Sequence, residues 1–373
     1  MKIGLNATCF NDRSTGAKQR FIGLYGSLFS QMPETEFIIF EPSDIKMESW
    51  FGNHKNVTFK QTGIPSSGRL KKFFFGLNFW KRILAKEEID YFEGFNLPSI
   101  QNSYGKTIHT IHDIRSTYRK FSSWEHIISR PIHIFSLKRV DFIITVSETM
   151  KREILELKPN SDISVIHNGL DQKSFAELHQ DTVDRVKKDL KLPSDFILSV
   201  GHLEHRKNYL NLIEGIKILK DSNFRIPLVI VGNDSGTKSK IDKKISEYDL
   251  HDLVRIYNNL TDIEVQALYR LSKLFVFPSI YEGFGIPILE SMAMNTPLIL
   301  SNIDVFKEIT QNKGIYFDPY DPSDIARCIK ETLMDENLIQ EIKDYGSRRV
   351  KDFDFDNLSR EFKNFYLKKI QIS

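Results

Sequence analysis

Short apolar segments alternate with longer segments of helical periodicity along nearly the whole sequence. A chain of this kind folds into parallel sheets with helices on both faces, because successive parallel strands need a helical crossover between them. In the first half, strands are expected at residues 2–7, 37–40, 57–59, 91–92, 107–111, 142–146 and 163–166. In the second half, they are expected at residues 196–200, 228–231, 254–257, 274–277, 298–300 and 315–317. The pattern therefore predicts an α/β protein with two doubly wound sheets.

The boundary between the two sheets is expected in a polar stretch, residues 168–193, which opens with the turn pair Asn168-Gly169. A length of 373 residues suits two or three domains at about 150 residues each. We place a first domain at residues 1–175 and a second at 176–355. Ligands bind beyond the carboxyl ends of strands in such sheets, so the site is expected between the two domains.

The composition limits the class of protein. Hydrophobic residues make up 40% of the chain and charged residues 27%, which are ordinary values for folded domains. The net charge of +3 is too small for a general nucleic-acid binder, but it suits local attraction to phosphates or to an anionic membrane. Only two cysteines occur, Cys9 and Cys328, so neither a disulfide framework nor a structural zinc site is expected. No apolar run approaches the roughly 18 residues of a membrane span, and a cytoplasmic protein is expected.

The most informative segment is residues 278–293, where a loop connects a strand to a helix. Gly283 and Gly285 allow the backbone to approach a ligand closely, and a helix that begins near Ile286 directs free N–H groups toward an anion. Glu282 lies in this loop and Glu290 lies one turn into the helix. The segment predicts a diphosphate-binding loop, and the alternative is an ordinary turn capped by a glutamate.

A second candidate loop, which carries two cations, follows the strand at 196–200. Gly201 ends that strand, and Arg206 and Lys207 precede a helix that begins near Tyr209. Two cations at a helix N-terminus are unfavourable unless an anion is bound there, so we interpret them as a clamp for a diphosphate. The alternative is a plain surface pair.

These segments, in their order, resemble the glycosyltransferases of family 4, which are retaining enzymes of the GT-B fold. The resemblance rests on the E-x7-E pattern from Glu282 to Glu290 and on several strings that occur in the family's order. These strings are the Gly16 loop, residues 110–113, 146–148, 166–171, 201–208, and Asp318-Pro319. It covers essentially the whole chain. It implies two Rossmann-like domains facing across a cleft, and a C-terminal helix, residues 356–373, that crosses back to the first domain.

The resemblance also implies a role for individual residues. Arg206 and Lys207 would meet the charge that builds on the departing diphosphate, Glu282 would hold sugar hydroxyls, and His112 would contact the transferred sugar or the acceptor. The remaining donor-binding positions would be Gly16, Gly201, His202, Leu260, Gly283, Phe284, Gly285, Ile286 and Glu290, with Glu290 on the ribose and Leu260 near the base. Asp113 would contact the acceptor or sugar. His202 departs from the family, which commonly has an arginine there.

No metal ion and no cofactor are expected. Asp352, Asp354 and Asp356 form overlapping D-x-D patterns like the metal sites of the other glycosyltransferase fold. They directly precede the last amphipathic helix, at residues 357–368, where an aspartate serves as an N-cap.

Residues 70–86 form a helical pattern that is apolar on two faces. One face, expected in the core, carries Leu70, Phe73, Phe74, Leu77, Trp80 and Leu84. The other carries Phe75, Phe79 and Ile83 among Lys71, Lys72, Arg82 and Lys86. Two interpretations fit: a helix that lies in an anionic membrane interface, or one that is buried on both sides.

The sequence thus predicts a retaining, metal-independent hexosyltransferase with a nucleotide diphosphate sugar as donor. The hexose is expected to be mannose or glucose, and the acceptor a glycan or a lipid-linked glycan of bacterial-type surface polysaccharide assembly, on the inner face of the membrane. Two other classes fit the same residues: a sugar-nucleotide epimerase of similar fold, and a non-catalytic membrane-associated protein that binds sugar nucleotides.

Overall fold

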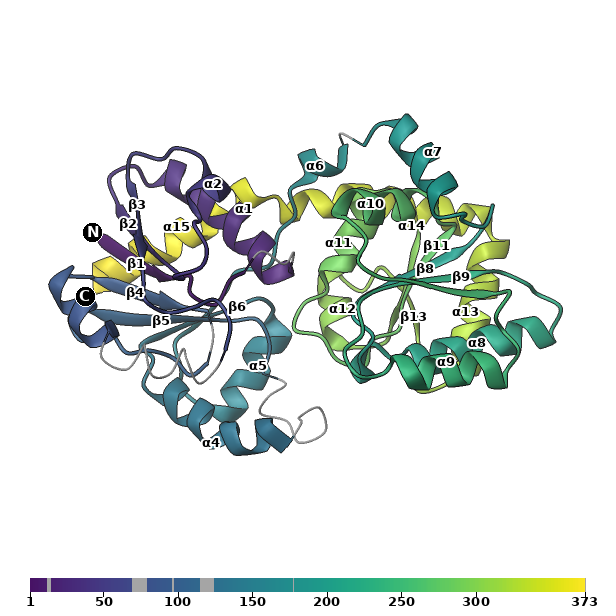
Figure 1. Cartoon of the computed structure of the whole chain (residues 1–373), viewed down its shortest axis with the longest axis horizontal. Helices are drawn as coiled ribbons and strands as arrows, with labels where there is room; N and C mark the ends of the chain where they lie inside the picture. The colour runs from purple at the N-terminus through teal and green to yellow at the C-terminus, as the bar shows by residue number, and fades with distance from the viewer. Residues whose placement is uncertain (12–14, 69–78, 96, 115–123, 177, 373) are drawn as a thin grey trace. The chain divides into compact units, whose positions relative to one another are not determined.

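The computed structural model describes residues 1–11, 15–68, 79–95, 97–114, 124–176 and 178–372 (Figure 1). The chain divides into two compact units, Met1–Gly169 with Phe355–Ser373 and Leu170–Asp354. We call them unit 1 and unit 2. Unit 2 is continuous in sequence, whereas unit 1 combines two segments. The boundary placed after residue 175 from the sequence lies a few residues beyond the change at Gly169.

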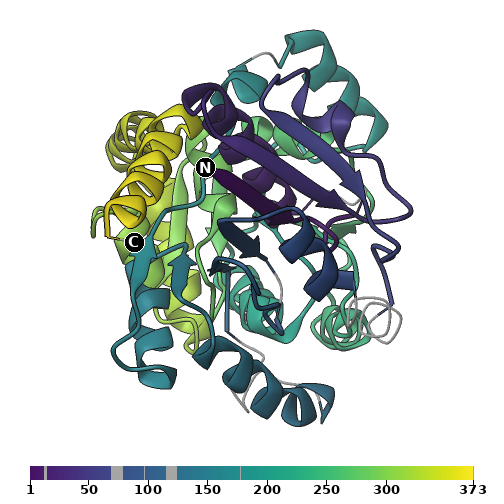
Figure 2. The ribbon, with the colours of Figure 1, turned by 90° about the vertical axis from the view of Figure 1, so that its left-hand side faces the viewer.

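Unit 1 is built on a seven-stranded parallel sheet with the order β3-β2-β1-β4-β5-β6-β7 (Figure 2). Its strands are β1 (Lys2–Asn6), β2 (Glu36–Glu41), β3 (Val57–Gln61), β4 (Tyr91–Gly94), β5 (Lys106–Ile111), β6 (Phe142–Thr145) and β7 (Ile163–Val165). Each strand overlaps the range predicted from the sequence. Strand β2 shows why these segments are apolar throughout. Phe37 and Ile39 belong to one core cluster, and Ile38 and Phe40 belong to another. Alternate side chains of a strand point to opposite faces, so both faces of this sheet are buried.

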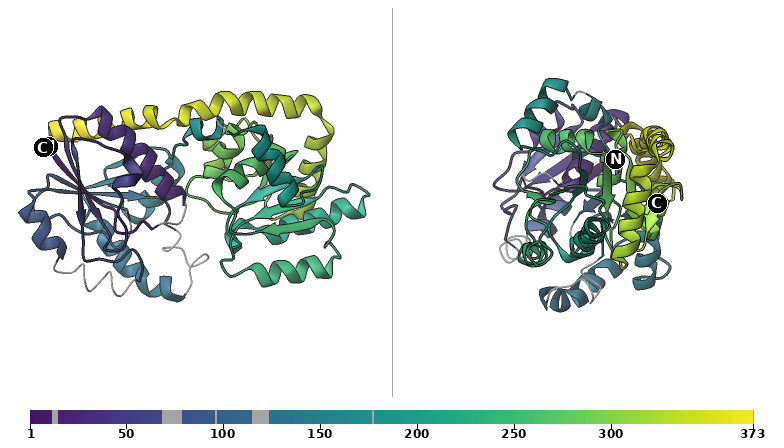
Figure 3. Two further views of the ribbon diagram at one scale, coloured as in Figure 1. Left: turned by 45° about the horizontal axis from the view of Figure 1, so that its top comes forward. Right: turned by 90° about the vertical axis from the view of Figure 1, so that its right-hand side faces the viewer.

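The helices of unit 1 include α1 (Gly16–Gln31), α2 (Glu48–Phe51), α4 (Trp124–Lys138), α5 (Glu148–Leu157) and α15 (Phe355–Ile372), and residues 79–86 are also helical. Helix α15 lies beside α1, as Figure 3 shows, so the C-terminal helix does return to the first unit. Its Phe362 ring packs edge-on against Tyr25 of α1, with ring centroids 5.3 Å apart. The terminal helix predicted at residues 357–368 is confirmed, and α15 extends beyond it at both ends, from Phe355 to Ile372.

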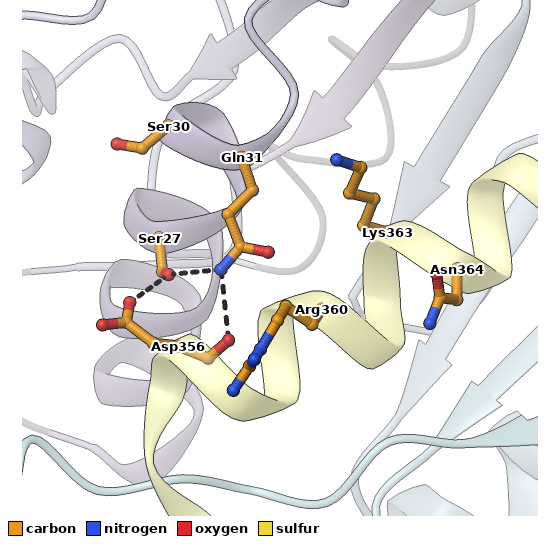
Figure 4. A pocket seen from close by; sticks show the side chains of 7 residues that line it. All are labelled: Ser27, Ser30, Gln31, Asp356, Arg360, Lys363 and Asn364. Carbon is orange, nitrogen blue, oxygen red and sulfur yellow. Dashed lines mark hydrogen bonds between the residues drawn. The ribbon is translucent and has the colours of Figure 1, made fainter.

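Polar contacts also join α1 and α15, around a shallow pocket between them (Figure 4). The Ser27 hydroxyl donates to the Asp356 carboxylate, and the Gln31 amide donates to the Asp356 carbonyl over 3.1 Å. Asp356 therefore fixes the start of α15 against α1, which is a structural role for the aspartate-rich segment.

Part of the 70–86 segment is described, from residue 79 on, while Phe75 and the other residues up to 78 lie outside the described residues. Trp80 and Leu84 are buried in a core cluster of unit 1, as predicted. Phe79 and Ile83, from the opposite predicted face, are half-buried and pack against the same cluster. Lys81, Arg82 and Lys86 are exposed. For the described residues, the apolar groups thus contact protein on both faces.

Unit 2 is built on a six-stranded parallel sheet with the order β10-β9-β8-β11-β12-β13. Its strands are β8 (Ile197–Val200), β9 (Leu228–Val231), β10 (Val254–Tyr257), β11 (Leu274–Phe277), β12 (Leu298–Ser301) and β13 (Ile315–Phe317). Helices α8 (Tyr209–Asp221), α9 (Lys238–Glu247) and α13 (Pro322–Met334) cover one face (Figure 1). Helices α10 (Asp262–Leu271), α11 (Ile286–Ala293) and α14 (Glu336–Arg349) cover the other (Figure 1). The shorter elements are α6 (Gln172–Ala176), α7 (Gln180–Asp189), η3 (His205–Lys207), α12 (Asp304–Ile309) and η4 (Val350–Phe353).

The strand order of unit 2 reverses between β8 and β11, which are neighbours in the sheet. Chain connections run outward in opposite directions from these two strands, so the loops beyond their carboxyl ends part and leave room for a ligand. The loop after β8 carries Arg206 and Lys207, and the loop after β11 carries Glu282. Topology therefore brings together the two loops that the sequence identified separately.

Candidate active site

The centre of the site is an ion pair between the two loops of unit 2. Lys207 Nζ lies 2.7 Å from Glu282 Oε1, and both side chains are largely buried. Lys207 Nζ also lies 4.7 Å from the centroid of the Phe277 ring, at the end of β11. The ammonium group is thus held between a carboxylate and an aromatic face.

Arg206 completes this charged cluster. Its guanidinium lies 2.6 Å from Glu282 Oε2 and 2.6 Å from Glu204 Oε1, and it donates to the Tyr281 carbonyl over 3.2 Å. The Ile280 amide in turn donates to the Arg206 carbonyl over 2.8 Å. Backbone and side chain of Arg206 thus both hold the β11 loop in place.

Burial and charge act in opposite directions on Glu282. Burial raises the pKa of its carboxyl group, but Lys207 and Arg206 outweigh burial and lower the pKa to about 2. Burial lowers the pKa of Lys207, opposed by the attraction of Glu282. Glu282 is therefore ionised at neutral pH and serves as the counterion of both cations.

Gly201 explains how Lys207 reaches this position. Gly201 has a φ of +150°, and a Cβ atom there would lie 2.9 Å from Cε and 3.1 Å from Nζ of Lys207. A larger residue would clash with the lysine stem as well as strain the backbone. The Tyr209 hydroxyl donates to the Gly201 carbonyl over 2.8 Å, which fixes the turn.

The loop after β11 leads into α11 as the sequence predicted. Gly285 occupies the N-cap position of α11 with a φ of +130°, and Pro287 lies in the first turn. Phe284 is buried, and its ring packs edge-on against Phe353 of η4. The Phe284 side chain is therefore a packing group, and a ligand at this loop would meet its backbone.

Glu290, on α11, lies in a different environment from Glu282. Its Oε2 atom accepts a hydrogen bond from the hydroxyl of Tyr269 over 2.9 Å. Burial raises the pKa of Glu290 to about 7; Asp262 adds to the shift, while the Tyr269 hydrogen bond and Lys207 oppose it. The two glutamates of the E-x7-E pattern thus differ in ionisation near neutral pH. Tyr269 was not identified from the sequence, where it appears as one more apolar position of a helix.

The remaining predicted residues of unit 2 lie at the same edge of its sheet. His202 directly follows Gly201 and is exposed. Leu260 is half-buried in the loop between β10 and α10.

In unit 1, the predicted residues follow two strands of its sheet. Gly16 begins α1, which follows β1, while His112 and Asp113 directly follow β5. Burial lowers the pKa of His112 to about 3, and Arg20 and His109 contribute in the same direction. His112 is therefore neutral at physiological pH.

A buried polar network underlies this part of unit 1, and no sequence pattern predicted it. Arg20 of α1 is 3% exposed and donates to the carbonyl of His167. Glu93 of β4 is fully buried and accepts from the Thr110 hydroxyl and, over 2.8 Å, from the Tyr366 hydroxyl of α15. Burial raises the pKa of Glu93 and lowers that of Arg20 to about 10. These groups join α1, β4, β5 and α15 inside the unit.

Within the described parts of the chain, no cluster of three or more His, Cys, Asp or Glu side chains is arranged to hold a metal ion. Among those same residues, no helix combines the length and the apolar character that crossing a bilayer requires.

Two family models match the chain, one mainly within each unit. Residues 35–174 match glycosyltransferase family 4, and residues 180–349 match the glycosyl transferases of group 1. The chain is 31% identical over 258 residues to the O-antigen chain mannosyltransferase RfbU of Salmonella typhimurium, an alignment that covers 69% of this chain and 68% of that one.

Two solved structures show the same fold. Sucrose-phosphate synthase from Thermosynechococcus elongatus matches with a TM-score of 0.78 and 19% identity, over 100% of both chains. HepE from Anabaena, in complex with UDP and glucose, matches with a TM-score of 0.74 and 14% identity, over 99% of this chain and 100% of that one. The fold and the matched models define a glycosyltransferase of the GT-B fold. The chain belongs to glycosyltransferase family 4.

Proposed function

We propose that this glycosyltransferase moves a hexosyl unit, mannosyl or glucosyl, from a nucleotide diphosphate sugar to a glycan or lipid-linked acceptor, with retention of anomeric configuration. The observation that carries this proposal is the Arg206–Lys207–Glu282 cluster at the reversal of strand order in unit 2. The two cations would receive the diphosphate, and their contacts with Glu282 hold them in place.

In the proposed reaction, negative charge grows on the diphosphate as its bond to the sugar breaks. Arg206, Lys207 and the N-terminus of α11 would stabilise this charge, because preorganised donors need no rearrangement at that moment. Glu282 would contact the sugar hydroxyls while it holds the two cations. Since no second carboxylate pair in the sequence suggests a double displacement, we propose departure and attack on the same face of the sugar.

The finer residue roles are also proposed. Glu290 would bind the ribose hydroxyls, and Leu260 would pack near the base. In unit 1, His112 and Asp113 would contact the acceptor or the transferred sugar. The neutral His112 expected from its low pKa would serve as a hydrogen-bond donor or acceptor rather than as a charge.

Mannose is favoured as the transferred sugar because the relative of 31% identity is named as an O-antigen chain mannosyltransferase. That name also supports surface polysaccharide assembly as the process, because it refers to the O-antigen chain. Glucose is the second candidate, since HepE was solved with UDP and glucose.

A panel of sugar nucleotides tests the donor by thermal stabilisation. A ligand at 100 times its Kd adds about 2.7 kcal/mol to the free energy of unfolding. A mannosyl nucleotide is the expected hit, and UDP-glucose the second. Product analysis with donor alone would reveal an epimerase, and binding without turnover on any glycan acceptor would indicate a non-catalytic protein. Either result would overturn the proposed reaction.

We further propose that the protein works at the cytoplasmic face of a membrane, with the exposed cations of the 70–86 segment as its contact. The described part of this segment offers the exposed cations Lys81, Arg82 and Lys86, each of which adds about 1 kcal/mol of attraction near an anionic surface. Sedimentation with vesicles of anionic lipid tests this: the R82E/K86E variant should stay in the supernatant, whereas wild type should pellet. Equal sedimentation of both proteins would refute it.

A further inference from the structure

We infer that Tyr269 is a positioning residue of the donor site: its hydroxyl orients the Glu290 carboxylate toward the ribose of the nucleotide. This inference rests on the proposed function, which places the ribose at Glu290. It concerns a residue that lies outside the E-x7-E segment and that the sequence did not identify.

Tyr269 is itself held firmly. It is fully buried on α10, and its ring packs against Phe275 of β11 with centroids 5.2 Å apart. Its carbonyl accepts hydrogen bonds from the hydroxyls of Thr296, over 2.7 Å, and Ser272, over 2.9 Å. With its ring and backbone both fixed, the hydroxyl is a rigid point from which to hold another group.

Glu290, by contrast, depends on Tyr269. The carboxylate is half-buried, and among the described residues the Tyr269 hydroxyl is its one recorded hydrogen-bond partner, through Oε2. Oε1 is therefore free to accept from a ligand. One bond to a rigid donor restricts the orientation of the carboxylate and leaves its second oxygen for a hydroxyl of the ribose.

The same arrangement links donor binding to protons. The titratable and charged groups that act on Glu290 are Tyr269 and Asp262 of α10 and Lys207 of η3. Burial raises the pKa of Glu290 to about 7, so near neutral pH part of the free protein carries the protonated acid. Ribose hydroxyls donate hydrogen bonds, which favours the ionised carboxylate. Binding of a ribonucleotide should therefore release protons, and affinity should rise as pH increases through 7.

Removal of the tyrosine hydroxyl should have two effects. The Y269F variant loses the bond that holds the carboxylate, so affinity for the ribonucleotide should fall by about 3- to 10-fold, the range expected for one hydrogen bond. It also loses a bond that lowers the pKa of Glu290, so the midpoint of the pH dependence should move to higher pH.

The experiment is isothermal titration calorimetry with GDP and UDP, and with the 2′,3′-dideoxy form of whichever binds more tightly. Y269F should weaken binding of the ribonucleotide and leave the dideoxynucleotide unchanged. In an E290Q background, Y269F should have no further effect, because the carboxylate through which it acts is gone. Titrations in buffers of different ionisation enthalpy should show proton release for wild type and none for E290Q.

The Y345F variant is the matched control. The Tyr345 hydroxyl of α14 donates to the carbonyl of Thr310 over 2.7 Å, so the Y345F variant loses a similar hydrogen bond in the same unit. It should leave all nucleotide affinities unchanged. Comparable melting temperatures of Y269F and Y345F would exclude a general loss of folding as the cause.

Three outcomes would overturn the inference. Equal losses for the ribonucleotide and its dideoxy form would show that Tyr269 acts on the whole site. An additive loss in the Y269F/E290Q double variant would show that it does not act through Glu290. Failure of wild type to bind GDP or UDP would overturn the proposed function, and the inference with it.

Discussion

Lys207 Nζ lies 2.7 Å from Glu282 Oε1, although 75 residues separate the two in sequence. The contact forms because β8 and β11 are neighbours in the sheet and each is followed by one of the two loops. The cations of the site are therefore already paired before a donor arrives. The diphosphate of the proposed reaction would add to this existing charge cluster and would not have to create one.

Replacement of either cation should reduce turnover. R206A and K207A each remove a positive charge that faces the growing charge of the leaving group, so kcat should fall on the order of 100-fold in each. R225A is the matched control, because Arg225 forms an exposed pair with Asp252, and its kcat should stay at the wild-type value. Steady-state kinetics measure all three. Full activity of R206A or K207A, or strict dependence on a divalent ion abolished by a chelator, would contradict the proposed chemistry.

The two glutamates should differ in their kinetic effects. E290Q weakens a contact to the ribose, which does not change during the reaction, so it should mainly raise KM. E282Q should mainly lower kcat, because Glu282 orients both Lys207 and Arg206 and lies beside the proposed sugar site. Kinetics with the donor identified by thermal stabilisation separate the two effects. If both variants changed only KM, the motif would be a binding clamp without separate roles.

Glu290 should make the stability of the protein depend on pH in a defined direction. Its pKa is about 7 in the folded protein against about 4.3 in an unfolded chain, so the folded state binds the proton more tightly. This contribution to stability is present below pH 4.3 and is lost as pH rises through 7. At pH 7.5 the free energy of unfolding of E290Q should therefore exceed that of wild type by on the order of 2 kcal/mol, and E290Q should melt at a higher temperature. The difference should shrink toward pH 5. Thermal melts across this range test it, with E247Q, an exposed glutamate, as the control. A difference that is independent of pH would show that Glu290 titrates normally.

Phe79 should contribute to the stability of unit 1. Its ring packs edge-on against Trp80, with centroids 5.1 Å apart, at the edge of a core cluster. F79S should therefore lower the free energy of unfolding by about 1–3 kcal/mol, somewhat less than for a fully buried aromatic. K81S, a change at an exposed neighbour, should have little effect. Denaturant titration gives both values, and an unchanged midpoint for F79S would favour the interfacial interpretation of this face.

Tyr366 should stabilise unit 1 through Glu93. Y366F removes a donor from a fully buried carboxyl group, which should cost about 1–3 kcal/mol. Y104F alters an exposed tyrosine of the same unit and should leave stability unchanged. Chemical denaturation measures the difference. If Y366F had the same free energy of unfolding as wild type, Glu93 would not depend on the Tyr366 hydroxyl for its hydrogen bonding.

The sequence predicted the fold well because the fold depends on periodicity. Every strand range was identified, since strands buried on both faces are apolar without interruption, as residues 37–40 show. The sequence also identified the two loops of the site and the helix that begins at Ile286.

What the sequence missed depends on pairing between distant segments. The Lys207–Glu282 contact follows from strand order, and strand order cannot be derived from periodicity. Tyr269 lies on an amphipathic helix, where a single hydroxyl does not alter the apolar pattern. Arg20 reads in the sequence as an ordinary helical cation, and periodicity does not show that it is buried. Similarly, the helical wheel of residues 70–86 could not show that Phe79 and Ile83 reach the same core cluster as Trp80.

The return of α15 to unit 1 has a consequence for the order in which the chain can fold during synthesis. Residues 1–169 leave the ribosome well before residues 355–372, and until then the Tyr25 ring of α1 lacks its contact with Phe362. Unit 2 is continuous from Leu170 to Asp354 and can close its core as soon as that segment has emerged. Folding should therefore be complete first in unit 2, although it is synthesised later than most of unit 1. Unit 1 can complete its core only after α15 has been synthesised.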